Sequence, residues 1–192
     1  MIKEEIRILG VDDSPFEKNQ KGKIPVVGVI YRGGKIFDGM LLTRVKVDGM
    51  DATTKLAELL LSTRHRKQLK VLMLDGITLA GFNLVDLEEL HAKTRLPLIA
   101  INRKIPDLRK VKAALKKFPD FERRWKVVER AGMISACKLN GKKIYYQSKG
   151  LQASEAEEII RLSCTRGFIP EPLRVAHLVA TALVKGESYG RA

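Results

Sequence analysis

Val71-Leu72-Met73-Leu74-Asp75 is an unbroken apolar run that closes on a carboxylate. A run without polar alternation is typical of a strand buried on both faces, as in the parallel part of an α/β sheet. Leu98–Ile101 is a second run of this kind, and Leu84–Lys93 between them has leucines at helical spacing. The order strand, helix, strand predicts a parallel crossover, which is right-handed in nearly all cases.

The residues before this unit predict an antiparallel meander. Ile6–Asp12 is a short apolar run that also ends on a carboxylate, and Asp13–Lys23 is a polar loop. Pro25–Tyr31 and Ile36–Val47 are rich in β-branched and apolar residues, and the two-glycine turn Arg32–Lys35 joins them. Such short connections pair strands antiparallel. The sequence therefore predicts an α/β fold with a mixed sheet.

Several helices are predicted around that sheet. Asp51 is placed to cap a helix over Ala52–Thr63. Asp107–Glu129 alternates basic and apolar residues, which predicts one or two amphipathic helices, with Pro119 as the dividing point. The remaining elements are a strand over Lys142–Gln147, a helix over Ser154–Thr165 with a capping box of Ser154 and Glu157, and a helix from Pro170-Glu171-Pro172 to Leu183, with Gly186 beyond its end. The length of 192 residues fits one domain, over residues 1–192.

The charge of the chain is strongly basic, with 36 Lys and Arg against 22 Asp and Glu and a net charge of +14. Ile101–Arg130 alone has eleven basic and four acidic residues. This surplus favours nucleic acid, either DNA or RNA, as the partner, and a solvated lysine-rich surface is the alternative. The predicted nucleic-acid contacts are Arg103, Lys104, Lys112, Lys116, Arg123 and Arg174. For Arg174, a structural salt bridge to Glu171 or another acid is the alternative.

Neither the cysteines nor the hydropathy suggests a secreted or membrane protein. Cys137 and Cys164 lie far apart and form no metal motif, so we expect reduced thiols. Met1–Glu5 lacks the apolar core of a signal peptide, and no apolar run approaches the roughly 20 residues of a membrane span. We expect a cytoplasmic protein without a membrane partner, and the sequence leaves its oligomeric state open.

Carboxylates end both early apolar strands, at Asp12 and Asp75. Ligands of open α/β sheets bind at the carboxyl ends of the strands, so these side chains could share Mg²⁺ or Mn²⁺ if the strands are neighbours. Asp51 could be a third ligand, and the three are the predicted catalytic and metal residues. Two metals would clamp the oxygens of a phosphodiester during hydrolysis. Ordinary turn and cap roles are the alternative for all three aspartates.

These residues together resemble endonuclease V. Gly10-Val11-Asp12 and Leu72-Met73-Leu74-Asp75-Gly76 are similar to its two acidic strands, and Pro97–Ile101 resembles the strand that follows. Phe168–His177, with Pro170-Glu171-Pro172, Arg174 and Ala176, resembles its closing segment. Over nearly the full chain, the sequence resembles an archaeal uncharacterised family called domain of unknown function 99, which is regarded as a relative of endonuclease V.

The resemblance implies a ribonuclease H-like fold and a Mg²⁺-dependent acidic site for nucleic-acid cleavage near deaminated adenine. Asp12 and Asp75 match two aspartates of that site, and Asp51 is the only counterpart of its glutamate. Arg103 replaces a lysine. Leu151 stands where a histidine is expected, and leucine neither binds a metal nor transfers a proton, so the acidic site is incomplete.

Three functions follow as hypotheses. The first is an endonuclease V-like, Mg²⁺-dependent phosphodiester hydrolase. A non-catalytic nucleic-acid-binding protein and a small-molecule phosphate-handling enzyme are the alternatives. His177 lies among apolar neighbours on the last helix, which favours a packing role for it.

Overall fold

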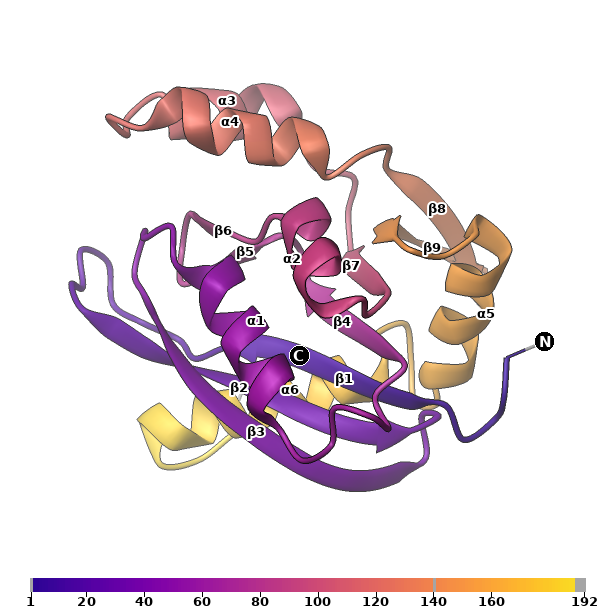
Figure 1. The fold of residues 1–192 in the computed structure, drawn as a ribbon. Helices are drawn as coiled ribbons and strands as arrows, with labels where there is room; N and C mark the ends of the chain where they lie inside the picture. Colours follow the sequence, from indigo (N-terminus) through magenta and orange to yellow (C-terminus); the bar gives the residue numbers. More distant parts are fainter. Residues whose placement is uncertain (1, 140, 189–192) are drawn as a thin grey trace.

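The computed structural model describes residues 2–139 and 141–188. Nine strands and six helices are found in these ranges (Figure 1). The strands are β1 Arg7–Asp13, β2 Lys23–Arg32, β3 Ile36–Lys46, β4 Val71–Asp75, β5 Thr78–Leu79, β6 Asn83–Leu84, β7 Leu98–Asn102, β8 Ser135–Leu139 and β9 Lys142–Lys149. The helices are α1 Ala52–Ser62, α2 Leu87–Thr94, α3 Leu108–Leu115, α4 Phe121–Arg130, α5 Ala153–Ser163 and α6 Glu171–Lys185.

Seven strands form one mixed sheet in the order β3-β2-β1-β4-β7-β9-β8. β1, β4 and β7 are parallel neighbours at its centre. β2 and β3 extend the sheet antiparallel on one side, and β9 and β8 do so on the other. The predicted meander and parallel crossover are both confirmed. β5 and β6 form a separate two-stranded ribbon.

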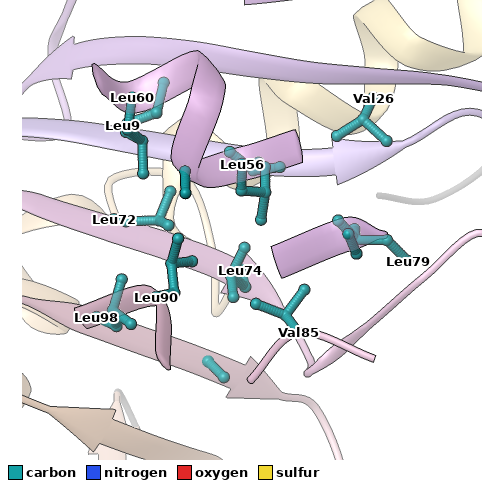
Figure 2. Close-up of a cluster of buried hydrophobic side chains, with 14 of the residues drawn as sticks. Leu9, Val26, Leu56, Leu60, Leu72, Leu74, Leu79, Val85, Leu90 and Leu98 are labelled. Atoms are coloured by element: carbon teal, nitrogen blue, oxygen red, sulfur yellow. The ribbon is translucent and has the colours of Figure 1, made fainter. Parts of the chain in front are cut away.

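Alternating side chains of the central strands build two cores. Leu9, Leu72 and Leu74 pack with Leu56 of α1 and Leu90 of α2 (Figure 2). The residues between them in the sequence point to the opposite face, where they meet α5 and the start of α6. This second set comprises Ile8, Val71, Met73, Ile99, Ile101, Ile159, Ile160 and Leu173. The sheet is therefore covered on both faces, as the apolar runs predict.

Three boundaries differ from the predictions. α2 begins at Leu87 rather than Leu84, because Asp86 accepts hydrogen bonds from the backbone N–H groups of Glu88 and Glu89 while Leu84 pairs in β6. The predicted capping box of Ser154 and Glu157 is wrong: α5 begins at Ala153, and Glu155 accepts from the backbone of Gln152. The strand β8 was not predicted.

α3 and α4 form a hairpin that stands beyond the sheet at the top of Figure 1, and they are separated at Lys116–Asp120, as Pro119 predicts. The buried Arg124 fastens α4 to the rest of the protein. Its guanidinium donates to the backbone oxygens of Asp48, Gly49 and Phe82, at 2.8, 3.1 and 2.6 Å. Arg124 is therefore buried, in contrast to the exposed basic residues around it such as Arg123 and Lys126. No helix in the described ranges is long and apolar enough to cross a membrane.

Candidate active site

Asp12 and Asp75 lie at the carboxyl ends of neighbouring parallel strands. Val11 of β1 is paired with Leu74 of β4, and each aspartate is the next residue of its strand. Asp12 shares the sheet face of Ile8, and Asp75 shares that of Val71 and Met73, so both side chains belong to the face that α5 and α6 cover. The prediction that these two strands are neighbours in the sheet is confirmed.

α6 brings a histidine to this pair. His177 Nδ1 lies 2.8 Å from Asp12 Oδ2, and this hydrogen bond raises the pKa of the imidazole. The helix comes this close because Gly10 has no side chain: a Cβ there would lie 2.4 Å from the carbonyl carbon of Pro172. The packing role predicted for His177 is therefore incomplete, since its ring is part of the acidic site.

Burial and the repulsion between neighbouring carboxylates raise the pKa values of two aspartates. The pKa of Asp75 is raised by burial and by the charge of Asp12, and Arg103 opposes the rise, with Nη2 3.6 Å from Asp75 Oδ2. Asp13 points to the other face of β1 and accepts from the backbone N–H of Ala80 at 3.0 Å. Burial and Asp12 raise the pKa of Asp13 to about 7. On the sheet face that α6 covers, the repulsion between Asp12 and Asp75 favours a cation between them.

Asp51 forms hydrogen bonds with residues outside this site. Its Oδ1 accepts from Asn83 Nδ2 at 2.6 Å and from the backbone N–H of Lys46 at 3.1 Å. It occupies the N-cap position of α1, but Asn83 Oδ1 accepts from the Ala52 N–H in its place. The structure thus brings together Asp12, Asp75 and His177, and gives Asp51 a structural set of contacts.

The donor set fits a cation that takes few protein ligands. Within residues 2–139 and 141–188, no three His, Cys, Asp or Glu side chains are grouped to hold a metal ion. Mg²⁺ commonly binds through one or two carboxylates and completes its shell with waters and phosphate oxygens. Asp12 and Asp75 meet that requirement.

The predicted nucleic-acid residues fall into two groups. Arg103 and Lys104 are exposed beyond β7, and Lys112, Lys116 and Arg123 are exposed on the α3–α4 hairpin. Arg174 instead forms the predicted alternative, a salt bridge in which its Nε and Nη2 donate to the carboxylate of the buried Glu171.

The histidine beside Asp12 comes from a different part of the chain than Leu151. Leu151 packs against the core on the α5 side, and the imidazole of the site comes from α6. The signal that could have found it is periodicity, because His177 lies four residues after Leu173 and three before Ala180, both of which are buried. His177 therefore belongs to the face of α6 that meets the sheet.

A small apolar cavity of about 150 Å³ begins beside Asp75. Gly76, Ile77 and Thr78 line one side of it, and apolar residues from the start of α3 line another. The amide side chains of Asn102 and Gln147 also line it. An apolar cavity with a few polar groups beside carboxylates is typical of a ligand site.

The fold is shared with several nucleases. Endonuclease V of Ciona intestinalis, solved with DNA containing an inosine followed by a ribo-adenosine, has a TM-score of 0.58 at 16% identity, over 89% of this chain and 82% of that one. Argonaute of Marinitoga piezophila, solved with guide RNA and target DNA, has a TM-score of 0.56 at 14% identity, over 93% of this chain and 30% of that one. The fold is therefore the expected ribonuclease H-like one.

Closer relatives are archaeal. A UPF0215 protein of Methanothermobacter thermautotrophicus is 47% identical over 192 residues, which is 100% of this chain and 94% of that protein. A protein of unknown function from Archaeoglobus fulgidus has a TM-score of 0.85 at 40% identity, over 94% of this chain and 99% of that one. Residues 4–184 match the family described as Endonuclease dU. The chain belongs to the endonuclease dU family.

Proposed function

We propose that the protein is a Mg²⁺- or Mn²⁺-dependent endonuclease that cleaves nucleic acid near a deaminated base. The observation that supports this most directly is the meeting of Asp12, Asp75 and His177 at the carboxyl edge of the central strands. The family description and the nucleic-acid complexes of its structural relatives agree with it.

Each side chain has a role that its contacts support. Asp12 and Asp75 would hold the cation, which supplies Lewis-acid stabilisation of the negative charge on the phosphate. Asp12 accepts from Nδ1 of His177, which assigns the proton of the neutral ring to Nδ1 and leaves Nε2 as the basic nitrogen. Nε2 would then take a proton from the attacking water or pass one to the leaving oxygen. Arg103, beside Asp75, would bind the phosphate.

The small cavity at Gly76 is the proposed site for the deaminated base. Enzymes that act at a base commonly turn it out of the stack into an apolar pocket and read its edge by hydrogen bonds. The Asn102 amide, which lines this cavity, would read the carbonyl and N–H groups of a uracil, the base that the family description indicates.

A cleavage assay tests the proposal. Single-stranded and duplex oligonucleotides containing deoxyuridine, deoxyinosine or no lesion would be incubated with Mg²⁺, Mn²⁺ or EDTA. We expect metal-dependent cleavage near deoxyuridine, abolished in Asp75→Asn and slowed about 10²- to 10⁴-fold in His177→Gln. His65→Gln, in the loop after α1, is the matched control and should cleave like the wild type.

The second candidate is a non-catalytic nucleic-acid-binding protein. It is favoured by the limited donor set, because no three ligating side chains among the described residues are grouped to hold a metal ion. Binding of every oligonucleotide without cleavage under any metal condition, and calorimetry showing no Mn²⁺ binding, would select it over the nuclease.

A further inference from the structure

A second, larger cleft is lined by Arg103. It has a volume of about 370 Å³ and is built by the start of β9, the segment between α5 and α6, and the first turn of α6. Its nine lining residues are Arg103, Lys142, Lys143, Ile144, Arg166, Gly167, Phe168, Ile169 and Arg174. Five of them are cationic and none is acidic.

The cleft is continuous with the acidic site at one end. Arg103 lines it and also lies 3.6 Å from Asp75. At the other end, Arg166 and Arg174 also line an adjoining hollow whose further residues include Tyr31, Lys35 and Glu171. Glu171 is the acid in this hollow, and it is already paired with Arg174. The uncompensated cations are therefore arranged as a path that leads away from the carboxylates.

The cations differ in how firmly they are held. Lys142 Nζ lies 4.5 Å from the ring centroid of Phe168, and Arg174 is fixed by Glu171. Lys143 and Arg166 are exposed, and their charges face the solvent of the cleft. Partnered cations beside unpartnered, solvent-exposed ones suit a chain of phosphates, because the partnered side chains hold defined positions and the exposed ones can reach a phosphate from solvent.

We propose that this cleft binds the phosphate backbone of the single-stranded segment that flanks the cleaved phosphodiester. The inference rests on the proposed function and adds to it the path of the substrate on one side of the bond. Charge complementarity and continuity with Asp75 through Arg103 support this occupant. The recognition would depend on phosphates and not on base identity.

The test uses binding and cleavage together. The variant Lys143→Glu/Arg166→Glu changes only exposed cations of the cleft. The matched control Arg66→Glu/Lys67→Glu reverses two exposed cations in the loop before β4, at the opposite end of that strand from Asp75. Fluorescence anisotropy with single-stranded oligonucleotides would be measured across a salt series, and thermal unfolding would confirm that all variants fold.

We expect the cleft variant to bind at least about tenfold more weakly at low salt. Its log–log salt slope should become shallower by about 1.4, since each phosphate contact on a single strand contributes roughly 0.7. The control should stay within about twofold of the wild type. Oligonucleotides trimmed on the 5′ or the 3′ side of the lesion show which side of the substrate contacts the cleft. Trimming that side should remove the difference in affinity between the wild type and the cleft variant.

Three results would contradict the proposed role of the cleft. They are an unchanged affinity in the cleft variant, an equal loss of affinity in the control variant, or a difference between wild type and cleft variant that persists with both trimmed substrates. The proposed nuclease function fails separately, by absence of cleavage in the wild type. In that case the binding comparison still decides whether the cleft holds the strand.

Discussion

Asp12 and Asp13 are adjacent in the sequence and have different surroundings. Side chains alternate across a strand, so Asp12 faces α6 and meets His177, while Asp13 faces the other side and meets the backbone of Ala80. One carboxylate is thus available to a cation in the site. The other is buried against the loop that follows Asp75 and is repelled by its neighbours.

The raised pKa of Asp13 makes stability depend on pH. The unfolded carboxyl releases its proton near pH 3.8 and the folded one near pH 7, so the folded protein holds the extra proton between these values. The free energy of unfolding therefore falls as pH rises through this window. Asp13→Asn should remove this dependence and become more stable than the wild type by up to about 4 kcal/mol above pH 7.

Urea unfolding of both proteins at intervals from pH 4 to pH 8 measures the effect. Glu122→Gln, at an exposed position of α4, is the control and should follow the wild-type curve. Parallel curves for Asp13→Asn and the wild type would contradict the prediction.

The site could be predicted in part from single residues. Asp12 and Asp75 are predictable because each ends an apolar run, although that the two strands are neighbours is shown only by the structure. Asp51 was included because it precedes a helix, but its partner Asn83 lies 32 residues away and no local pattern announces that contact. The apolar neighbours of His177 predict a packing role, and its partner Asp12 is 165 residues away, where no local pattern indicates the contact.

At the scale of elements, the packing of α6 on β1 assembles the site. A Cβ at Gly10 would lie 2.4 to 2.6 Å from three atoms of Pro172, two of which are backbone. Gly10→Ala must therefore push the first turn of α6 away from the sheet, and His177 with it. We expect a loss of more than about 3 kcal/mol in unfolding free energy, the upper range for overpacking.

Gly28→Ala is the matched control on the next strand. Its Cβ would meet the end of the Leu9 side chain at 3.0 Å, which can move, so we expect a loss below about 1.5 kcal/mol. Urea denaturation gives both values, and nitrogen chemical shifts of the His177 ring would report its separation from Asp12. Equal losses of unfolding free energy in the two variants would show that the close packing of α6 on β1 does not require a glycine at position 10.

The strands that were not predicted from the sequence have weak local patterns. β8 reads Ser-Ala-Cys-Lys-Leu, and it is a strand because β9 pairs with it. β5 and β6 have two residues each, too few for any periodicity. The long apolar strands and amphipathic helices were predictable because burial on the sheet dictates their patterns, whereas these short elements depend on contacts made elsewhere in the fold.

At the scale of the whole molecule, two surfaces with exposed cations are candidates for contact with nucleic acid. One is the cleft of Lys143 and Arg166, and the other is the outer face of the α3–α4 hairpin. On that face Lys112 lies over the Trp125 ring at 4.6 Å, and Lys116 and Arg123 are exposed. Val111, Phe121 and Val128 of the hairpin pack toward the rest of the protein, whereas Leu108 is exposed, and the exposed cations can contact an anionic partner.

Duplex binding should therefore depend steeply on salt through this hairpin. A contact with roughly four phosphates gives a log–log slope near −4, since each contributes about −0.9 on B-form DNA. Reversing Lys112, Lys116 and Arg123 together to glutamate should reduce the steepness by about 2.7, with little dependence on base sequence. Fluorescence anisotropy with labelled duplexes across a salt series measures both slopes. No binding by the wild type at low salt would remove duplex nucleic acid from its partners, and an unchanged slope in the triple variant would assign the duplex contact to a surface other than the hairpin.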